Sequence, residues 1–230
     1  MTEHGPELEA EGAGTPPAPA SGWLEGRTAP DWAEEAARRS GHARIGPYLL
    51  GPVLGEGGMG TVHLAWDAIL GRRVALKLVR GESADLLRRM IQEARLQARV
   101  EHPAVCRIYQ VGEEPDRPYI AMQYIQGANL AEWAPHLGLE GKLRLLIQVA
   151  DAVNTAHRMG LIHRDLKPSN LLVEQDEAGV LRPFVMDFGL ARDMGGIGIT
   201  QHGIAVGSPS YMAPEQAIGE RVDERTDVYG

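Results

Sequence analysis

The stretch HRDLKPSN, at residues 163–170, sets an aspartate, a lysine and an asparagine at short, fixed spacings. The carboxylate of Asp165 can orient a hydroxyl group and accept its proton. The ammonium of Lys167 can neutralise charge on a phosphoryl group, and the amide oxygen of Asn170 can bind a hard cation such as Mg²⁺. A chance match to all of these positions is improbable, so the stretch predicts a catalytic loop.

A second acidic motif, Asp187-Phe188-Gly189, follows this loop at short distance. It comes directly after the apolar residues 184–186, which are typical of a strand. An aspartate at a strand end is well placed to bind Mg²⁺ that bridges phosphate groups. The tripeptide alone is a weak signal, but after the octet it predicts that Asn170 and Asp187 are the metal ligands.

Upstream, the segment GEGGMGTV at residues 55–62 is rich in glycine. Glycines let backbone amides approach a polyphosphate without obstruction by side chains. Dinucleotide-binding folds share this spacing, but there a helix follows the glycines. Residues 62–66 instead alternate like a strand, which favours a hairpin over nucleotide phosphates and argues against a dinucleotide-binding oxidoreductase. Taken alone, the segment is equally compatible with an ordinary Gly-rich turn.

A lysine stands among apolar residues in the sequence VALK, residues 74–77. Burying an ammonium is costly unless it meets negative charge, which phosphates and a carboxylate would supply to Lys77. Glu93, within a predicted helix, is the best candidate for that carboxylate. Glu82 and Asp85 are alternatives at or before the start of the helix. Taken alone, each residue fits a structural explanation better: Lys77 as an edge-strand lysine that reaches solvent, and Glu93 as part of a solvated helix face. Only the combination of the two favours the functional interpretation.

Hydrophobic periodicity divides the chain after a leader of residues 1–44 that is rich in Gly, Pro, Ala and Glu. The leader cannot bury enough apolar surface to order itself, so we expect a mostly disordered segment with a short helix near residues 32–39. Trp23 and Trp32 in it are candidates for docking on a partner or on the folded region. The following pattern predicts strands at 48–54, 61–67, 73–79, 105–111 and 118–124, with a helix at 84–100, and then helices at 128–134 and 141–159 and short strands at 171–173 and 184–186.

Taken in their order along the chain, the motifs resemble those of the protein kinase superfamily. The segments GEGGMG and YMAPEQ are similar to those of bacterial Hanks-type serine/threonine kinases. The resemblance runs from about Tyr48 to Gly230. It implies an α+β, two-lobed fold: an N-lobe of five antiparallel strands with one helix at residues 45–125, and a mainly helical, incomplete C-lobe at residues 126–230. Lys167 followed by Pro168 is typical of serine/threonine rather than tyrosine kinases.

The resemblance implies ATP and Mg²⁺ as cofactors, with Mn²⁺ as a substitute, and protein Ser/Thr hydroxyls as acceptors. It gives Asp165, Lys167, Lys77 and Glu93 catalytic roles. Met122 would be the gatekeeper, and the backbone of Gln123 and Ile125 would bond the adenine edge. The full set implied for ATP binding is Leu54, Gly55, Gly57, Gly60, Val62, Ala75, Lys77, Met122, Gln123, Ile125 and Leu172.

Regulation is implied by the polar stretch that ends in GSPSYMAPE, residues 207–215. Thr200 is the expected autophosphorylation site, paired with Arg164, and an unmodified loop threonine is the alternative. Ser208 stands where the family has threonine, and its hydroxyl can still contact Asp165 and Lys167. A kinase dimer would serve phosphorylation between copies.

Composition limits other functions. A net charge of −8 argues against nucleic-acid binding as the main role, and a single cysteine, Cys106, excludes an internal disulfide or a cysteine-based zinc site. The first 20 residues have no apolar core and do not resemble a secretory signal, and no apolar run reaches the length of about 18 residues that a membrane span needs. We expect a cytoplasmic kinase region.

Two departures from the family pattern stand out. Gln97 lies where the family packs an apolar residue behind the phenylalanine of the DFG motif. The sequence also stops within what resembles the large helix of the C-lobe, which begins at about Asp227, so we expect these residues alone to be unstable or prone to aggregate. A non-catalytic, pseudokinase-like scaffold is therefore the alternative function, although none of the catalytic residue types is missing.

Overall fold

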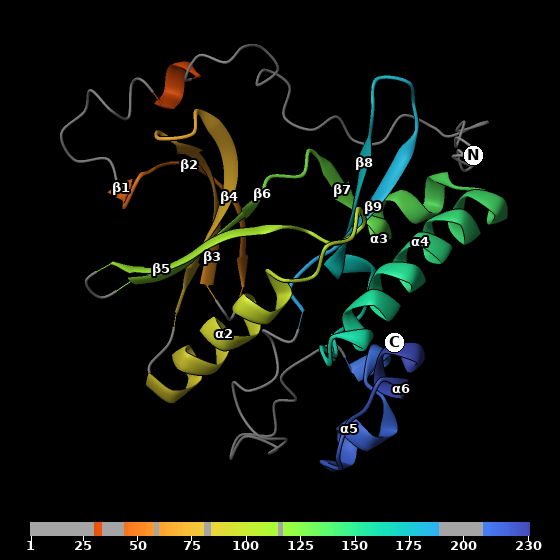
Figure 1. The fold of residues 1–230 in the computed structure, drawn as a ribbon. Coiled ribbons are helices and arrows are strands. Elements are labelled where there is room, and N and C mark those ends of the chain that lie inside the picture. Colours follow the sequence, from red (N-terminus) through yellow and green to blue (C-terminus); the bar gives the residue numbers. More distant parts are fainter. Residues whose placement is uncertain (1–29, 34–43, 58–59, 81–83, 115–116, 189–208) are drawn as a thin grey trace, which may run out of the picture. The chain divides into compact units, whose positions relative to one another are not determined.

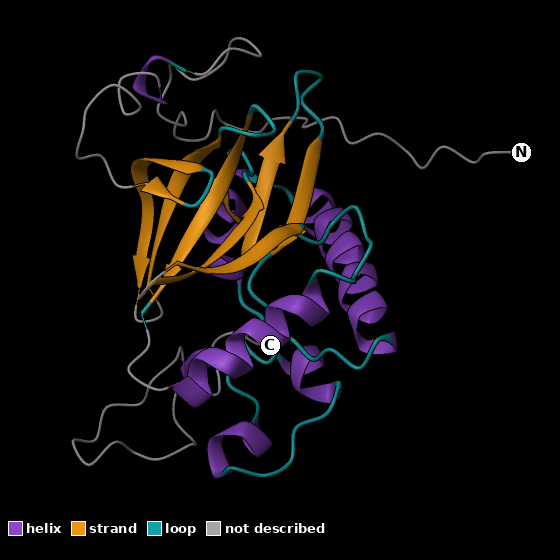
Figure 2. Ribbon diagram, turned by 60° about the vertical axis from the view of Figure 1, so that its left-hand side comes forward, coloured by secondary structure: helices purple, strands orange, loops and turns teal. Residues whose placement is uncertain are grey.

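The structure, a computed structural model, describes residues 30–33, 44–57, 60–80, 84–114, 117–188 and 209–230. These residues divide into two compact units. One contains the described residues up to Arg99 together with Cys106–Tyr124, and the other contains Val100–Val105 and the described residues from Ile125 onwards (Figures 1 and 2). Among the described helices, none is both long and apolar enough to cross a membrane.

The first unit is built on an antiparallel sheet of six strands in the order β1-β2-β3-β4-β6-β5. We expected five strands; the sixth is β1, whose two residues pair with the start of β2 across a tight turn at Gly46. Helix α2 lies beside β5 (Figure 1). The elements are β1 (Arg44–Ile45), β2 (Tyr48–Gly57), β3 (Gly60–Asp67), β4 (Arg72–Val79), α2 (Ala84–Gln97), β5 (Ile108–Glu114) and β6 (Arg117–Gln123).

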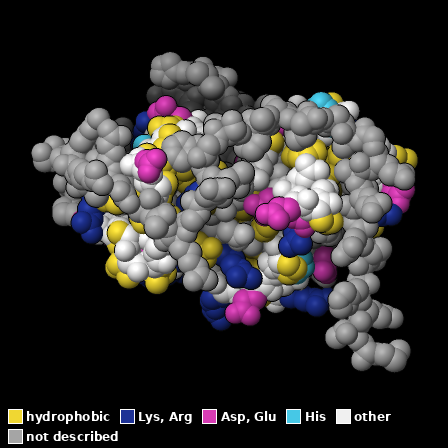
Figure 3. All heavy atoms as spheres, turned by 90° about the horizontal axis from the view of Figure 1, so that it is seen from above, with side chains coloured by type: hydrophobic (Ala, Val, Ile, Leu, Met, Phe, Trp, Pro, Cys, Tyr) yellow, Lys and Arg dark blue, Asp and Glu magenta, His cyan; other side chains and the backbone are white. Residues whose placement is uncertain are grey.

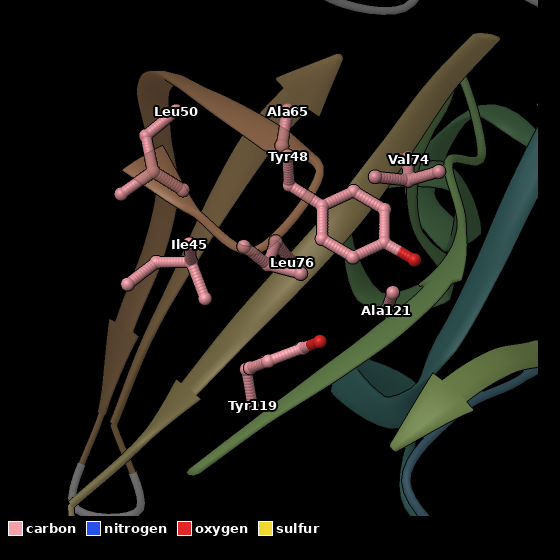
Figure 4. Close-up of a cluster of buried hydrophobic side chains, with 8 residues drawn as sticks. All are labelled: Ile45, Tyr48, Leu50, Ala65, Val74, Leu76, Tyr119 and Ala121. Carbon is pink, nitrogen blue, oxygen red and sulfur yellow. The ribbon is translucent and has the colours of Figure 1, made fainter. Parts of the chain in front are cut away.

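Alternation along the strands gives this sheet two different faces. One face carries the hydrophobic core of the unit, where the rings of Tyr48 and Tyr119 meet edge to face with centroids 5.8 Å apart. Burial raises the pKa of Tyr48 to about 12, and its hydroxyl donates to Gln110 Oε1 at 2.7 Å. Figure 4 shows these rings with the aliphatic side chains around them: Ile45, Leu50, Ala65, Val74, Leu76 and Ala121.

The second unit combines a three-stranded antiparallel sheet, in the order β7-β8-β9, with helices. The long helix α4 lies along β9 (Figure 1). Its buried residues include Leu145, Val149, Ala152 and Ala156. The elements are β7 (Gly127–Asn129), α3 (Leu130–Trp133), η1 (Ala134–His136), α4 (Leu139–Arg158), η2 (Pro168–Asn170), β8 (Leu171–Gln175), β9 (Leu181–Val185), η3 (Pro209–Tyr211), α5 (Pro214–Ile218) and α6 (Arg225–Tyr229).

Several element boundaries differ from the sequence prediction. The helix expected at 128–134 begins only at Leu130, because Gly127–Asn129 pairs with β8 and the Asn129 side chain caps the helix by accepting from Glu132 N at 3.1 Å. The strand expected at 105–111 is β5, which starts at Ile108, while Val105 makes an isolated parallel bridge to Val185. Helix α2 ends at Gln97 rather than at residue 100.

Candidate active site

The predicted catalytic loop lies in the second unit, between α4 and β8. Helix α4 ends at Arg158, and Gly160 turns the chain with a φ of 74°, a conformation that favours glycine. Within the octet, Pro168 opens the short helix η2, where its fixed φ and missing N–H are tolerated. The octet is thus anchored at one end by a helix and at the other by a strand.

Asp165 is the centre of a hydrogen-bonded cluster. Lys167 Nζ lies 3.0 Å from Asp165 Oδ1 and 2.8 Å from Oδ2. Asn170 Nδ2 donates to the same Oδ2 at 2.9 Å and to the backbone oxygen of Asp165 at 2.7 Å. The carboxylate is about a quarter exposed, so its orientation is fixed while one side still faces solvent.

Asp227, at the start of α6, holds the backbone of the loop. Its Oδ2 accepts from His163 N and its Oδ1 from Arg164 N, both at 2.7 Å. His157 Nε2 also lies 2.7 Å from Oδ2. Because the Asp227 side chain is fully buried, these charge-assisted bonds replace the water that the carboxylate has lost.

The buried ring of His163 has a definite tautomer in this arrangement. Its Nδ1 accepts from Asp165 N at 3.3 Å, so the proton is on Nε2, which donates to the carbonyl oxygen of Met186 at 2.8 Å. Burial lowers the pKa of His163, although the neighbouring carboxylates oppose that shift. The ring of Phe188 packs against it with centroids 4.8 Å apart, so His163 joins the loop to the DFG motif as a neutral side chain.

Two residues of the site have an unusual backbone conformation. Arg164 has a φ of 65° and Asp187 a φ of 52°, and they are the only non-glycine residues with positive φ in the described part of the chain. Such a conformation costs roughly 1–3 kcal/mol and persists only where surrounding contacts enforce it. For Arg164 the contacts are Asp227 on its N–H and Gln216 Nε2, which donates to its carbonyl oxygen at 2.8 Å.

Asn170 and Asp187 are brought together by the β8–β9 hairpin. Leu171 pairs with Val185, and just beyond that pair Met186 N donates to Asn170 O at 3.0 Å. Since Asn170 Nδ2 bonds Asp165, the amide oxygen points away from that contact and remains available as a ligand. Oxygen donors of this kind suit a hard divalent cation, so both residues fit the predicted metal site.

The glycine-rich hairpin belongs to the first unit, where β2 turns into β3. Gly60 has a φ of 141°, and a Cβ there would lie 1.9 Å from Leu78 O, so its glycine is required by the fold. Gly55 and Gly57 differ: a Cβ at either would meet no described atom within 4 Å. Packing of the described residues does not require glycine at these two positions, which is consistent with a ligand that approaches the backbone.

Four residues predicted to bind ATP share the face of the sheet opposite the tyrosine core. Val62 pairs directly with Lys77, and Ala75 pairs directly with Met122. Directly opposed residues of antiparallel strands point to the same side, and Ala75 and Lys77 are two residues apart. Lys77 is only 4% exposed, and Ala75 and Met122 are also buried.

The remaining predicted residues lie at various places in the described chain. Glu93 is half-buried on α2, and Leu54 is exposed on β2. Gln123 ends β6, and its N–H donates to Arg107 O at 2.8 Å, while Ile125 is buried. Leu172 is half-buried on β8. Thr200 and Ser208 lie outside the described residues.

Three supporting residues were missed by the sequence analysis: Asp227, His157 and Gln216. Asp227 was noted only as the approximate start of a helix. An acidic residue in a first helical turn is also common for its interaction with the helix dipole, so the sequence carried no signal of its contact with the loop.

Gln97 stands where the family pattern has an apolar residue. Its side chain is buried, and Nε2 donates to Cys106 O at 3.1 Å instead of packing as an apolar group would.

The face drawn in Figure 3 shows basic and acidic side chains next to one another along its lower edge.

Across the described residues, no group of three or more His, Cys, Asp or Glu side chains could hold a metal ion. A cation at Asn170 and Asp187 would therefore need further oxygen ligands, which the phosphates of a bound nucleotide and water would provide.

Comparison with known proteins identifies the family. A model of the protein kinase domain matches residues 48–230. A probable serine/threonine-protein kinase of Streptomyces coelicolor is 42% identical over 211 residues, covering 85% of this chain and 30% of the relative. The serine/threonine-protein kinase PknB of Mycobacterium tuberculosis is 40% identical over 197 residues, which cover 79% of this chain and 30% of PknB. The crystal structure of the PknI kinase domain of M. tuberculosis matches with a TM-score of 0.66 and 27% identity, over 82% of this chain and 72% of that one.

The chain belongs to the protein kinase family. The predicted α+β kinase fold and the resemblance to bacterial Hanks-type serine/threonine kinases are confirmed. The family implies the use of ATP, a divalent metal and protein substrates. The chain spans about 30% of the length of the curated relatives it matches.

Proposed function

We propose that this chain transfers the γ-phosphate of ATP to Ser and Thr hydroxyls of proteins, with Mg²⁺ as the preferred metal and Mn²⁺ as a substitute. The observation that carries the proposal is the Asp165 cluster. A carboxylate fixed by Lys167 and Asn170, and still partly open to solvent, is the arrangement that a general base for a hydroxyl acceptor needs.

In the proposed reaction the acceptor oxygen attacks the γ-phosphorus, the bond from that phosphorus to the β–γ bridging oxygen breaks, and ADP leaves. Asp165 accepts the proton of the acceptor hydroxyl. Lys167, held on Asp165, offsets charge on the transferring phosphoryl group. Bound at Asn170 and Asp187, the divalent cation would neutralise the phosphates and fix their orientation.

The first unit would hold the nucleotide. Lys77 would bind the α- and β-phosphates, with Glu93 as its carboxylate partner, and the backbone at Gly55 and Gly57 would cover the phosphates. The openness at Gly55 and Gly57 supports this role, because the described residues leave that space free. Arg164 would pair with a phosphate added to the segment that contains Thr200 and Ser208.

The class of acceptor can be tested by labelling. Protein incubated with Mg²⁺ and ATP radiolabelled at the γ-position, alone and with a generic protein substrate, is hydrolysed in acid and the phosphoamino acids are separated. We expect phosphoserine and phosphothreonine. Label on tyrosine, or release of inorganic phosphate without any protein label, would contradict the proposal.

A further inference from the structure

A helical turn at residues 31–33, upstream of the family match at residues 48–230, lies against strand β2 (Figure 1). Ala33 is fully buried, and its N–H donates to Pro30 O at 2.7 Å. A Cβ built on Gly51 would lie 2.9 Å from Trp32 Cζ3 and 3.0 Å from Cη2. The six-membered ring of the indole therefore rests directly on the Gly51 backbone.

Gly51 is glycine because of this close packing rather than because of its backbone conformation. Its φ lies outside the left-handed region, so other residues could adopt it. A Cβ would also meet Leu64 O of the neighbouring strand at 2.9 Å, so the position is crowded from two sides. His63 Nδ1 lies 3.2 Å from Gly51 O and adds a contact from β3.

The contact lies where the β2–β3 ladder becomes irregular. The pairing shifts register between Leu50 and Val53 and again between Val53 and Gly55. Irregular pairing of this kind bends and twists the bulged strand, so it sets the direction in which the glycine-rich hairpin leaves the sheet. A large ring packed on the backbone at Gly51 restricts that bend.

We propose that Trp32 is a docking anchor through which the segment before the kinase domain positions the glycine-rich hairpin for nucleotide binding. The surface that receives it consists of Gly51 on β2 and the backbone of Leu64 on β3, and its occupant is Trp32 of the same chain. This inference rests on the proposed binding of ATP by the hairpin. Trp32 is a positioning residue, and its loss frees the hairpin and weakens ATP binding.

The test compares Trp32→Ala with Asp31→Ala in the whole chain. The control replaces an exposed residue of the same helical turn and leaves the indole in place. Two quantities are measured: the affinity for a non-hydrolysable ATP analogue with Mg²⁺, and amide hydrogen exchange across residues 52–64. Trp32→Ala is expected to weaken affinity at least about fivefold, a modest coupling between sites, and to speed exchange in that segment. Trp32→Phe restores part of both, and Asp31→Ala changes neither.

Equal affinity and equal exchange in Trp32→Ala and the unaltered protein would overturn the inference. Faster exchange spread evenly over the first unit would also overturn it, because that is the result of general destabilisation. If the unaltered protein does not bind the analogue, the proposed function fails. The exchange data then decide the docking separately: faster exchange confined to residues 52–64 supports it, and unchanged exchange refutes it.

Discussion

Asp227 Oδ1 accepts a 2.7 Å hydrogen bond from the backbone N–H of Arg164, a residue held at a φ of 65°. The two residues are 63 positions apart. The second oxygen of the same carboxylate accepts from His163 N, so the buried side chain of Asp227 fixes two consecutive peptide groups just before the proposed base Asp165. The catalytic loop therefore depends on α6 for its conformation.

Replacing Asp227 with alanine should destabilise the protein and reduce phosphate transfer together. Two backbone N–H groups would lose their acceptor in a buried place, at a cost of about 3 kcal/mol or more in the free energy of unfolding. Asp227→Asn keeps one acceptor oxygen and should lose less. Thermal unfolding and steady-state transfer rates measure both effects. The control Glu224→Gln, an exposed residue just before α6, should change neither, and an equal loss there would refute a specific role for Asp227.

Replacing Lys167 with alanine should lower kcat for phosphate transfer about 100-fold, the usual scale for losing one charged or donor group from a reacting centre. Its ammonium contacts both oxygens of Asp165, and Asn170, which donates to one of these oxygens, is a neutral amide that cannot replace the charge. The affinity for ATP should change much less. Lys142→Ala on α4 is the matched control, because it removes the same side chain away from the loop. Similar kcat values for the two variants would contradict the assignment.

The glycines of the hairpin should separate structural from ligand-binding roles. Gly60→Ala should destabilise the first unit, because its Cβ would overlap Leu78 O and its φ is unsuited to alanine. Gly57→Ala should leave the melting temperature unchanged and weaken ATP affinity roughly tenfold, about 1.4 kcal/mol. Calorimetric titration and thermal unfolding of both variants provide the comparison. A Gly57→Ala protein that binds ATP normally would argue against backbone contact with phosphates at that position.

His163 should make stability depend on pH. The folded-state pKa of His163 is below 6.5 because of burial, so as the pH falls through 6.5 the unfolded chain binds a proton that the folded chain does not. The free energy of unfolding should therefore decrease as the pH falls below 6.5, by at most about 1.4 kcal/mol per pH unit from this residue. Above 6.5 both states are neutral and the contribution is constant.

The variant His163→Gln removes this contribution and should flatten the dependence between pH 6.5 and 5, as measured by chemical unfolding at a series of pH values. His136→Gln, at the end of η1, changes the number of histidines without touching the buried ring. The account of His163 fails if the two variants show the same slope.

The parts of the fold that sequence analysis predicted are those coded by neighbouring residues. The stripe Leu145, Val149, Ala152 and Ala156 was visible at helical spacing and is buried in α4. The strand β4 was recognised from the apolar run around Lys77. The motifs of the catalytic loop were recognised because eight adjacent positions carry their chemistry.

The parts that were missed depend on long-range contacts or on very short elements. Gln216 Nε2 donates to Arg164 O, although the two residues are 52 positions apart in the sequence. Neither residue type predicts that contact. Strand β1 has only two residues, too few for an alternating pattern. The predicted helix includes residues 128 and 129, because the pairing of Gly127–Asn129 with β8 cannot be read from local propensity.

The most direct test of the account compares the unaltered protein with Asp165→Asn in phosphate transfer from ATP to a protein substrate, after ATP affinity has been measured for both. Asparagine preserves the shape of the side chain but cannot act as a carboxylate base. We predict equal ATP affinity and a loss of transfer by about 100-fold or more in Asp165→Asn. Equal transfer rates at equal ATP affinity would contradict the assignment of Asp165 as the base and with it the proposed kinase activity of this loop.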